Sequence, residues 1–163
     1  MTIEIKLVTK KPARSQLHVL IVPSDQIDEL PESIDRDFLK SRDFKGESGQ
    51  ILFTHSAERP VALLGVGSLE NLAHTNYRQA GAKLLREVKN FHSMSVDFSG
   101  YFNENVDQPN ATQAFLEGAF LGAYEFTQLK SKTKKPSLKT IAVIGSGQKI
   151  KQANRSQAYW IEI

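Results

Sequence analysis

EGAFLGAYEF, at residues 117–126, is the most informative segment of this chain for its fold. Residues three or four apart share one face of a helix, so Gly118 and Gly122 lie on a stripe that continues back to Ala111 and Ala114. Each glycine costs about 1 kcal/mol of helix stability relative to alanine, which indicates that the stripe serves close packing against a sheet or another helix. The opposite arc is also apolar and carries Phe115, Leu116, Phe120 and Tyr124. The segment therefore predicts a helix that is buried on most sides.

A second helix is predicted upstream, because one apolar stripe follows its helical period and consists of Tyr77, Ala80, Gly81, Leu84, Leu85 and Val88. Asn76 is the candidate N-cap, with Gln79 three residues later in a capping-box arrangement. Asn110 and Gln113 repeat this signature before the glycine-containing helix. Pro109 is expected to keep the residue before it extended.

Strands are predicted at residues 3–7, 17–22, 51–54, 61–66, 94–98 and 138–144. Strands and helices alternate from residue 61 to residue 144, which implies parallel pairing with right-handed crossovers. The first two strands are expected to pair with each other through residues 10–15 and to extend the sheet. The predicted fold class is therefore α/β, with a mixed, largely parallel sheet flanked by helices.

Length and composition fit one domain of ordinary polarity. The chain has 163 residues, of which 40% are hydrophobic and 24% are charged. It has no cysteine, which excludes disulfides, thiolate metal sites and a cysteine nucleophile. No apolar run approaches the roughly 20 residues of a membrane span, and the amino terminus lacks a signal-peptide pattern. We therefore expect a cytoplasmic protein without a membrane partner.

The charges are unevenly distributed, although the net charge is only +3. Residues 24–47 hold eight carboxylates against four basic side chains, which indicates an acidic surface excursion. Residues 127–155 hold eight basic side chains and no acid: Lys130, Lys132, Lys134, Lys135, Lys139, Lys149, Lys151 and Arg155. A solvated linker and surface turn explain this basic segment best, and a nucleic-acid or acidic-partner patch is the alternative.

The usual signatures of catalysis and metal binding are missing. The four histidines are His18, His55, His74 and His92, and no two of them have the spacing of a helix face or a metal loop. Structural roles are favoured for His18 and His74. Asp97 is the single carboxylate whose setting is predicted to be buried, and one acid does not make a metal site. We assign no catalytic, cofactor-binding or metal-binding residue to this chain.

Two glycine pairs resemble phosphate loops only in part. Gly65 and Gly67 follow a strand, but Glu70 stands where a dinucleotide motif has its third glycine. Gly145 and Gly147 also follow a strand and lack the full fingerprint. A strand-ending turn is the favoured interpretation of both.

The order of these elements resembles the amino-terminal domain of the leucyl (cytosol) aminopeptidases, two-metal exopeptidases with a macro-domain-like front half. The resemblance rests on a pattern of six residues that is followed by Lys130-Ser131-Lys132 and then by a strand. The six residues are Glu117, Gly118, Leu121, Gly122, Tyr124 and Phe126. Upstream support comes from residues 62–67 and from Arg78, Ala80 and Gly81. The resemblance covers roughly residues 1–150 and fades after Arg155.

The resemblance implies a three-layer, macro-domain-like fold for residues 1–150, with residues 151–163 starting a linker toward an absent catalytic domain. In the family that domain supplies carboxylates and a lysine to two divalent metals, zinc or manganese. Its ligand segment Asn-Thr-Asp-Ala-Glu-Gly-Arg has no match here. We therefore expect this chain alone to be an inactive front domain. It would pack against the catalytic domain of the same polypeptide, support a homohexamer and meet peptide substrate only through that catalytic domain.

Other functions stay open at this point. True macro domains bind ADP-ribose, but the sequence shows no clear combination of Asp and glycine loops for that ligand. A stand-alone module could bind nucleic acid through residues 130–155 or a nucleotide at Gly65 or Gly145, although no aromatic residue is interleaved with the lysines. A purely structural interaction protein is a further alternative. The apolar end of the chain, which includes Trp160, indicates either a continuation or a final edge strand.

Overall fold

A computed structural model of the protein describes residues 3–8, 10–12, 14–88, 90–98, 106–129 and 137–145, without the side chains of residues 108 and 124–129. The described residues form one six-stranded sheet in the order β1-β6-β5-β2-β4-β3. The strands are β1 (Glu4–Val8), β2 (Leu17–Pro23), β3 (Ile51–His55), β4 (Pro60–Gly67), β5 (Ser93–Asp97) and β6 (Thr140–Ile144). Neighbouring strands of this sheet are parallel except β3, which is antiparallel to β4. The predicted α/β class with a mixed, largely parallel sheet is confirmed.

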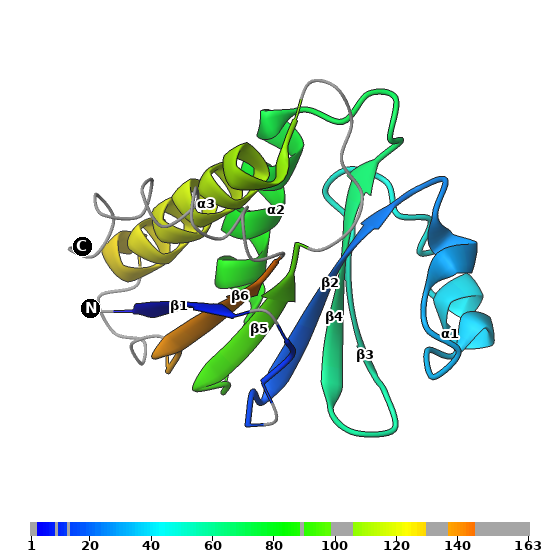
Figure 1. Cartoon of the computed structure of the whole chain (residues 1–163), viewed down its shortest axis with the longest axis horizontal. Coiled ribbons are helices and arrows are strands. Elements are labelled where there is room, and N and C mark those ends of the chain that lie inside the picture. Colours follow the sequence, from blue (N-terminus) through cyan, green and yellow to red (C-terminus); the bar gives the residue numbers. More distant parts are fainter. Residues whose placement is uncertain are drawn as a thin grey trace.

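Helices cover both faces of the sheet (Figure 1). One face carries α2 (His74–Glu87) and α3 (Gln108–Leu129), and the other carries the short helices η1 (Ile27–Glu29) and α1 (Arg36–Ser41). Alternate residues of β4 divide the core accordingly. Ala62 and Leu64 belong to the larger cluster under α2 and α3, whereas Val61 and Leu63 join a smaller cluster with Leu39 of α1. This is the three-layer arrangement that the resemblance implied.

The expected pairing of the first two strands is wrong. β1 pairs with β6 at one end of the sheet, and β2 lies between β5 and β4. Polarity explains the difference. β2 is a nearly continuous apolar run that is buried along almost its whole length, as a central strand of a parallel sheet requires. β1 alternates polar and apolar residues and is half-exposed, which suits an edge.

Both helix starts differ from the predicted caps. α2 begins at His74, and Asn76 lies inside its first turn, where its side-chain oxygen accepts a 2.8 Å hydrogen bond from the backbone N–H of Ala73. α3 begins at Gln108, so Pro109 lies in the first turn, where proline is tolerated. The carboxylate of Asp107 accepts the backbone N–H of Asn110 at 3.0 Å and takes the capping role assigned to Asn110.

The acidic excursion lies on the surface, as predicted. Every one of its eight carboxylates is exposed. Asp35 caps α1 by accepting hydrogen bonds from the backbone N–H groups of Asp37 and Phe38, and the buried side chains of Ile34 and Leu39 fix this short helix to the sheet. No helix in the described part of the chain combines the length and hydropathy of a membrane span.

Candidate functional site

Three glycines allow the backbones of α2 and α3 to pack in close contact. A Cβ atom built on Gly118 would lie 1.8 Å from the backbone oxygen of Arg78, and one on Gly122 would lie 2.4 Å from that of Ala82. On the other helix, a Cβ on Gly81 would lie 2.1 Å from the backbone oxygen of Phe115. These distances leave no room for a methyl group, so the predicted close-packing role of Gly118 and Gly122 is confirmed.

One ion pair bridges the two helices beside the glycines. Arg78 of α2 donates from Nη2 to Oε2 of Glu117 on α3 at 2.9 Å, and its Nε donates to the same oxygen at 3.3 Å. Gln113, one turn earlier on α3, donates to the other oxygen of Glu117 at 3.1 Å. The side chain of Arg78 is 42% exposed and that of Glu117 is 21% exposed. The pair is thus partly shielded from water and orients the two helices.

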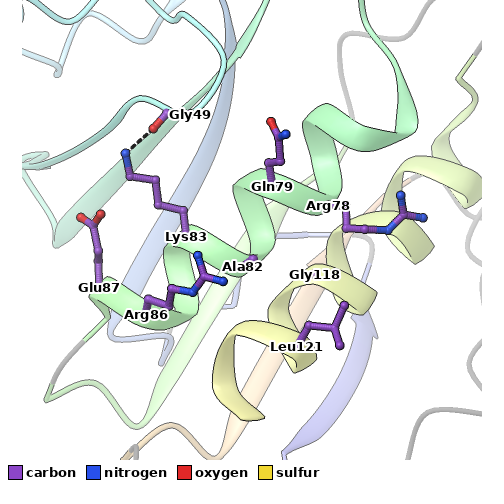
Figure 2. A pocket seen from close by; sticks show the side chains of 9 residues that line it. All are labelled: Gly49, Arg78, Gln79, Ala82, Lys83, Arg86, Glu87, Gly118 and Leu121. Atoms are coloured by element: carbon purple, nitrogen blue, oxygen red, sulfur yellow. Dashed lines mark hydrogen bonds between the residues drawn. The ribbon is translucent and has the colours of Figure 1, made fainter. Parts of the chain in front are cut away.

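A groove of about 510 Å³ runs along this contact, between the turn at Gly49 and the exposed side chain of Leu121. Figure 2 shows Lys83 and Arg78 pointing to opposite sides of it. Lys83 reaches back to the carbonyl oxygen of Gly49, whereas Arg78 turns across α3 to its ion pair with Glu117. Small-molecule sites are built from polar groups that converge on one point. The groove lacks this property.

A smaller hollow of about 140 Å³ lies near the amino ends of α2 and α3 and is lined by His74, Arg78, Asn110, Gln113, Ala114 and Glu117. Arg78, Gln113 and Glu117 are the members of the bridge described above. Their polar atoms already satisfy one another, so the hollow belongs to the helix–helix contact.

The chain itself closes the first candidate phosphate loop. The backbone N–H of Gly65 donates to Gln50 O at 2.8 Å, and that of Gly67 donates to Gly46 O at 3.0 Å. A Cβ on Gly65 would meet Glu47 O at 2.1 Å, so this glycine permits the close approach of the segment before β3. These amides are not available to an anion. Gly65 and Gly67 lie within β4, which ends at Gly67, and not in a turn after the strand as the sequence predicted. At the second candidate, Gly145 N donates to Val8 O at 3.1 Å, and Gly147 lies outside the described residues.

The four histidines lie on separate segments. His18 is in β2, His55 ends β3, His74 opens α2 and His92 precedes β5. Nδ1 of His18 lies 2.9 Å from Ser95 Oγ. Ser95 is fully buried, and His18 is 8% exposed. Burial, together with the nearby charges of Lys11 and Arg59, lowers the pKa of His18 to about 4, against opposing effects of Asp97 and Glu58. The imidazole is therefore neutral and serves as a structural group of the central sheet.

No group of three or more histidine, aspartate or glutamate side chains in the described residues could hold a metal ion. Asp97 is half-buried at the end of β5, less enclosed than the sequence predicted. Of the basic segment, Lys139 is exposed, and the other lysines and Arg155 lie outside the described residues, as does Trp160.

Residues 9–133 match a sequence model described as "Cytosol aminopeptidase family, N-terminal domain". The chain belongs to this family. It is 31% identical over 148 residues to a probable cytosol aminopeptidase of Chlorobium limicola, a match that covers 80% of this chain and 29% of that protein. A probable cytosol aminopeptidase of Alkaliphilus metalliredigens is 29% identical over 104 residues, which are 61% of this chain and 21% of the relative. The chain thus spans less than a third of the length of these curated relatives.

Solved structures share the fold. A mutant of tomato leucine aminopeptidase aligns with a TM-score of 0.70 at 16% identity, over 95% of this chain and 35% of its own. The bottromycin maturation enzyme BotP aligns with a TM-score of 0.65 at 20% identity, over 88% of this chain and 30% of its own. Cytosol aminopeptidases are metal-dependent peptide hydrolases. The side chains of the described residues do not form a ligand set for such metals.

Two interactions of this region were not predicted from the sequence. Arg78 and Glu117 both belong to the pattern that carried the resemblance, but 39 residues separate them, and neither helix period nor spacing links them. Ser95 and His18 become neighbours because β2 pairs with β5 in the sheet, whereas the sequence predicted that β2 pairs with β1.

Proposed function

We propose that this chain is the non-catalytic front domain of a two-metal leucyl aminopeptidase. In this proposal residues 1–150 form the domain, and residues 151–163 begin the connection to a catalytic domain of the same polypeptide. That catalytic domain binds zinc or manganese and removes amino-terminal residues from peptides in the cytoplasm. The front domain packs against it and contributes to a homohexamer.

One observation carries the proposal: the family match falls on the amino-terminal domain alone, over residues 9–133. The coverage of the relatives supports the same assignment, since the matched part is 29% of the Chlorobium limicola protein. The packing between α2 and α3 fits a structural role, because the glycines bring the two helices into close contact and the Arg78–Glu117 pair bridges them.

An activity assay tests the catalytic part of the proposal. We expect the purified 163-residue chain to leave leucine p-nitroanilide intact with added manganese or zinc, because two-metal hydrolysis needs a constellation of carboxylates that we do not find in it. Metal-dependent turnover that copurifies with the chain through every column would contradict the proposal.

The gene tests the domain arrangement. We expect the reading frame after the codon for Ile163 to encode the metal-ligand segment Asn-Thr-Asp-Ala-Glu-Gly-Arg, and the longer product to hydrolyse the same substrate. A stop codon there, without a neighbouring peptidase gene, would oppose a front-domain role.

A further inference from the structure

Part of the sheet face that carries α1 is polar. Alternate residues of a strand point to opposite faces of a sheet. In β5, Met94 and Val96 belong to the larger apolar cluster, so Ser95 and Asp97 point to the face of α1. His18 of the neighbouring β2 lies on that face too, since its partner in the register is Ser95. Among the described residues, the smaller apolar cluster includes none from β5. A polar strip along β5 therefore lies beside the layer of α1.

The connection from β1 to β2 covers this strip. Both strands run parallel to β6 and β5, which lie between them, so the chain crosses the sheet from the carboxyl end of β1 to the amino end of β2. The strap is the described part of this connection, residues 10–12 and 14–16. Ser15 Oγ lies 3.1 Å from Ser95 Oγ, so the strap crosses on the face of Ser95 and His18. Ser95 is fully buried beneath it.

Polar contacts hold the strap on the sheet. Nη1 of Arg59, in the turn between β3 and β4, donates to Pro12 O at 2.8 Å and to Ser15 O at 2.9 Å. Nζ of Lys11 donates to Oε2 of Glu58 in the same turn at 3.2 Å. No described residue of the strap belongs to either apolar cluster. Segments with few buried apolar contacts are the first to open locally, so the strap is the part of this face that should open before the sheet.

A chain of hydrogen bonds beneath the strap fixes the tautomer of His18. A carbonyl oxygen only accepts, so the hydroxyl of Ser15 donates to Leu17 O at 2.8 Å. The 3.1 Å contact between the two serine hydroxyls then requires Ser95 to donate to Ser15. Ser95 has no second proton, so Nδ1 of His18, 2.9 Å from its oxygen, donates to it. Nε2 is therefore the unprotonated nitrogen of the neutral ring.

The closed strap opposes a second proton on His18, which binds Nε2 and makes the ring a cation. Burial lowers the pKa of His18 most, and the charges of Lys11, in the strap, and Arg59, which clamps it, lower the pKa further. Asp97 and Glu58 act in the opposite direction. Opening the strap hydrates the ring and moves Lys11 away from it. Protonation of His18 and opening of the strap therefore favour each other.

We infer that the strap is an acid-sensitive latch, which stays closed over β5 while His18 is neutral and opens locally, ahead of the rest of the fold, when His18 takes up a proton. Opening exposes the polar strip of β5, with Ser95 and Asp97, to solvent. The latch lies wholly within this chain, so it operates with or without a catalytic domain.

Nitrogen NMR of the histidine rings tests the hydrogen-bond chain. At pH 7 we expect the Nδ1–H tautomer at His18, with an unprotonated Nε2. Ser95→Ala removes the acceptor of the Nδ1 proton and should release the ring to a mixture of both tautomers. An Nε2–H tautomer in the wild type overturns the chain of hydrogen bonds and the latch with it.

Hydrogen exchange tests the opening of the strap. The backbone N–H groups of Ser15 and Gln16 report on it, because they donate to Pro12 O at 3.4 Å and to Ser93 Oγ at 3.1 Å. An open strap returns His18 from a pKa of about 4 to the ordinary 6.5, so both protection factors should fall about twentyfold from pH 7 to pH 5. They should also be at least about tenfold lower than those of amides in β4 at both pH values, because the strap opens without global unfolding.

Two histidine variants isolate the role of His18. His18→Gln should keep both strap protection factors within about twofold between pH 7 and pH 5, because glutamine does not titrate. His74→Gln is the matched control, since His74 is exposed at the start of α2, and it should behave like the wild type. A fall that persists in His18→Gln overturns the latch. So do strap amides that are as protected as those of β4 and change only with them, a comparison that needs the wild type alone even if His18→Gln fails to fold.

Discussion

The two faces of the sheet are covered in different ways. On one face, α2 and α3 approach so closely that backbone oxygens of α2 occupy the space beside Gly118 and Gly122. On the other, a long acidic excursion contributes the two short helices η1 and α1 and a small apolar cluster around Leu39. Packing on the first face requires glycines, which have no side chain, whereas packing on the second face rests on a few buried apolar side chains. The two faces should therefore respond differently to substitution.

The largest effect is expected on the glycine-packed face. Gly118→Leu should lower the free energy of unfolding by about 3 kcal/mol or more, at the upper end of overpacking costs, because Cβ alone would lie 1.8 Å from the backbone oxygen of Arg78. Urea denaturation measures the change. Leu121→Ala, at an exposed position one turn further along α3, is the control and should change stability by less than about 0.5 kcal/mol. A Gly118→Leu variant as stable as the wild type would mean that the helices do not meet there.

The next effect compares the two apolar clusters. Leu84→Ala, in the larger cluster, should cost about 3 to 4 kcal/mol, and Leu39→Ala, in the smaller one, about 2 kcal/mol. Both leucines are almost fully buried, so the difference reports how easily the surroundings collapse into the cavity. Denaturation of both variants measures it. A larger loss for Leu39→Ala would show that the acidic excursion is the more tightly packed layer.

A smaller effect is expected from the pH dependence of His18, which lies in the central sheet. The pKa of His18 is about 4 in the folded chain and 6.5 for an ordinary histidine, which represents the unfolded chain. As the pH falls, the unfolded chain therefore binds a proton at His18 before the folded chain does. This contribution to stability is complete above about pH 6.5 and is lost as the pH falls to about 4, to a total of about 3 kcal/mol.

The pH effect is isolated by comparison with His18→Gln. Wild type and variant share all other titrating groups, so the difference between their unfolding free energies should depend on pH in this window and level off above it. A constant difference from pH 7 to pH 4 would show that the imidazole is not held neutral by burial.

Sequence reasoning predicted local features of this fold better than pairings between distant segments. The small-residue stripe of α3 and the apolar stripe of α2 follow the helix period, so Gly118, Gly122 and Gly81 could be placed from the sequence alone. The neighbours of β1 could not. Strand order depends on which strands bury both faces, and β2 takes the central position because of its continuous apolar run. The cap of α3 was placed three residues late, because Asp107 competes with Asn110 as an acceptor.

The candidate site divides in the same way. The resemblance selected Arg78 and Glu117 individually, and the structure joins them. The contact between Ser95 and His18 depends on the register of β2 against β5, which cannot be predicted from the sequence of either strand alone. The turn predicted at Gly65 rested on local strand and turn patterns alone, whereas this glycine lies within β4 against the segment around Glu47, which was not predicted.

The smallest effect distinguishes the helix bridge from surface charges. Removing the pairing of Arg78 with Glu117, measured by a double-mutant cycle with Arg78→Gln and Glu117→Gln, should give a coupling free energy of about 0.5 to 1 kcal/mol. Solvent reaches the arginine and screens the pair, which keeps the value low, while the double hydrogen bond to one carboxylate oxygen keeps it above zero. The matched cycle on Lys11 and Glu58, whose side chains are 39% and 66% exposed, should give less than about 0.5 kcal/mol. If both cycles gave the same coupling, the bridge would be an ordinary surface pair, and the glycine contact alone would hold α2 against α3.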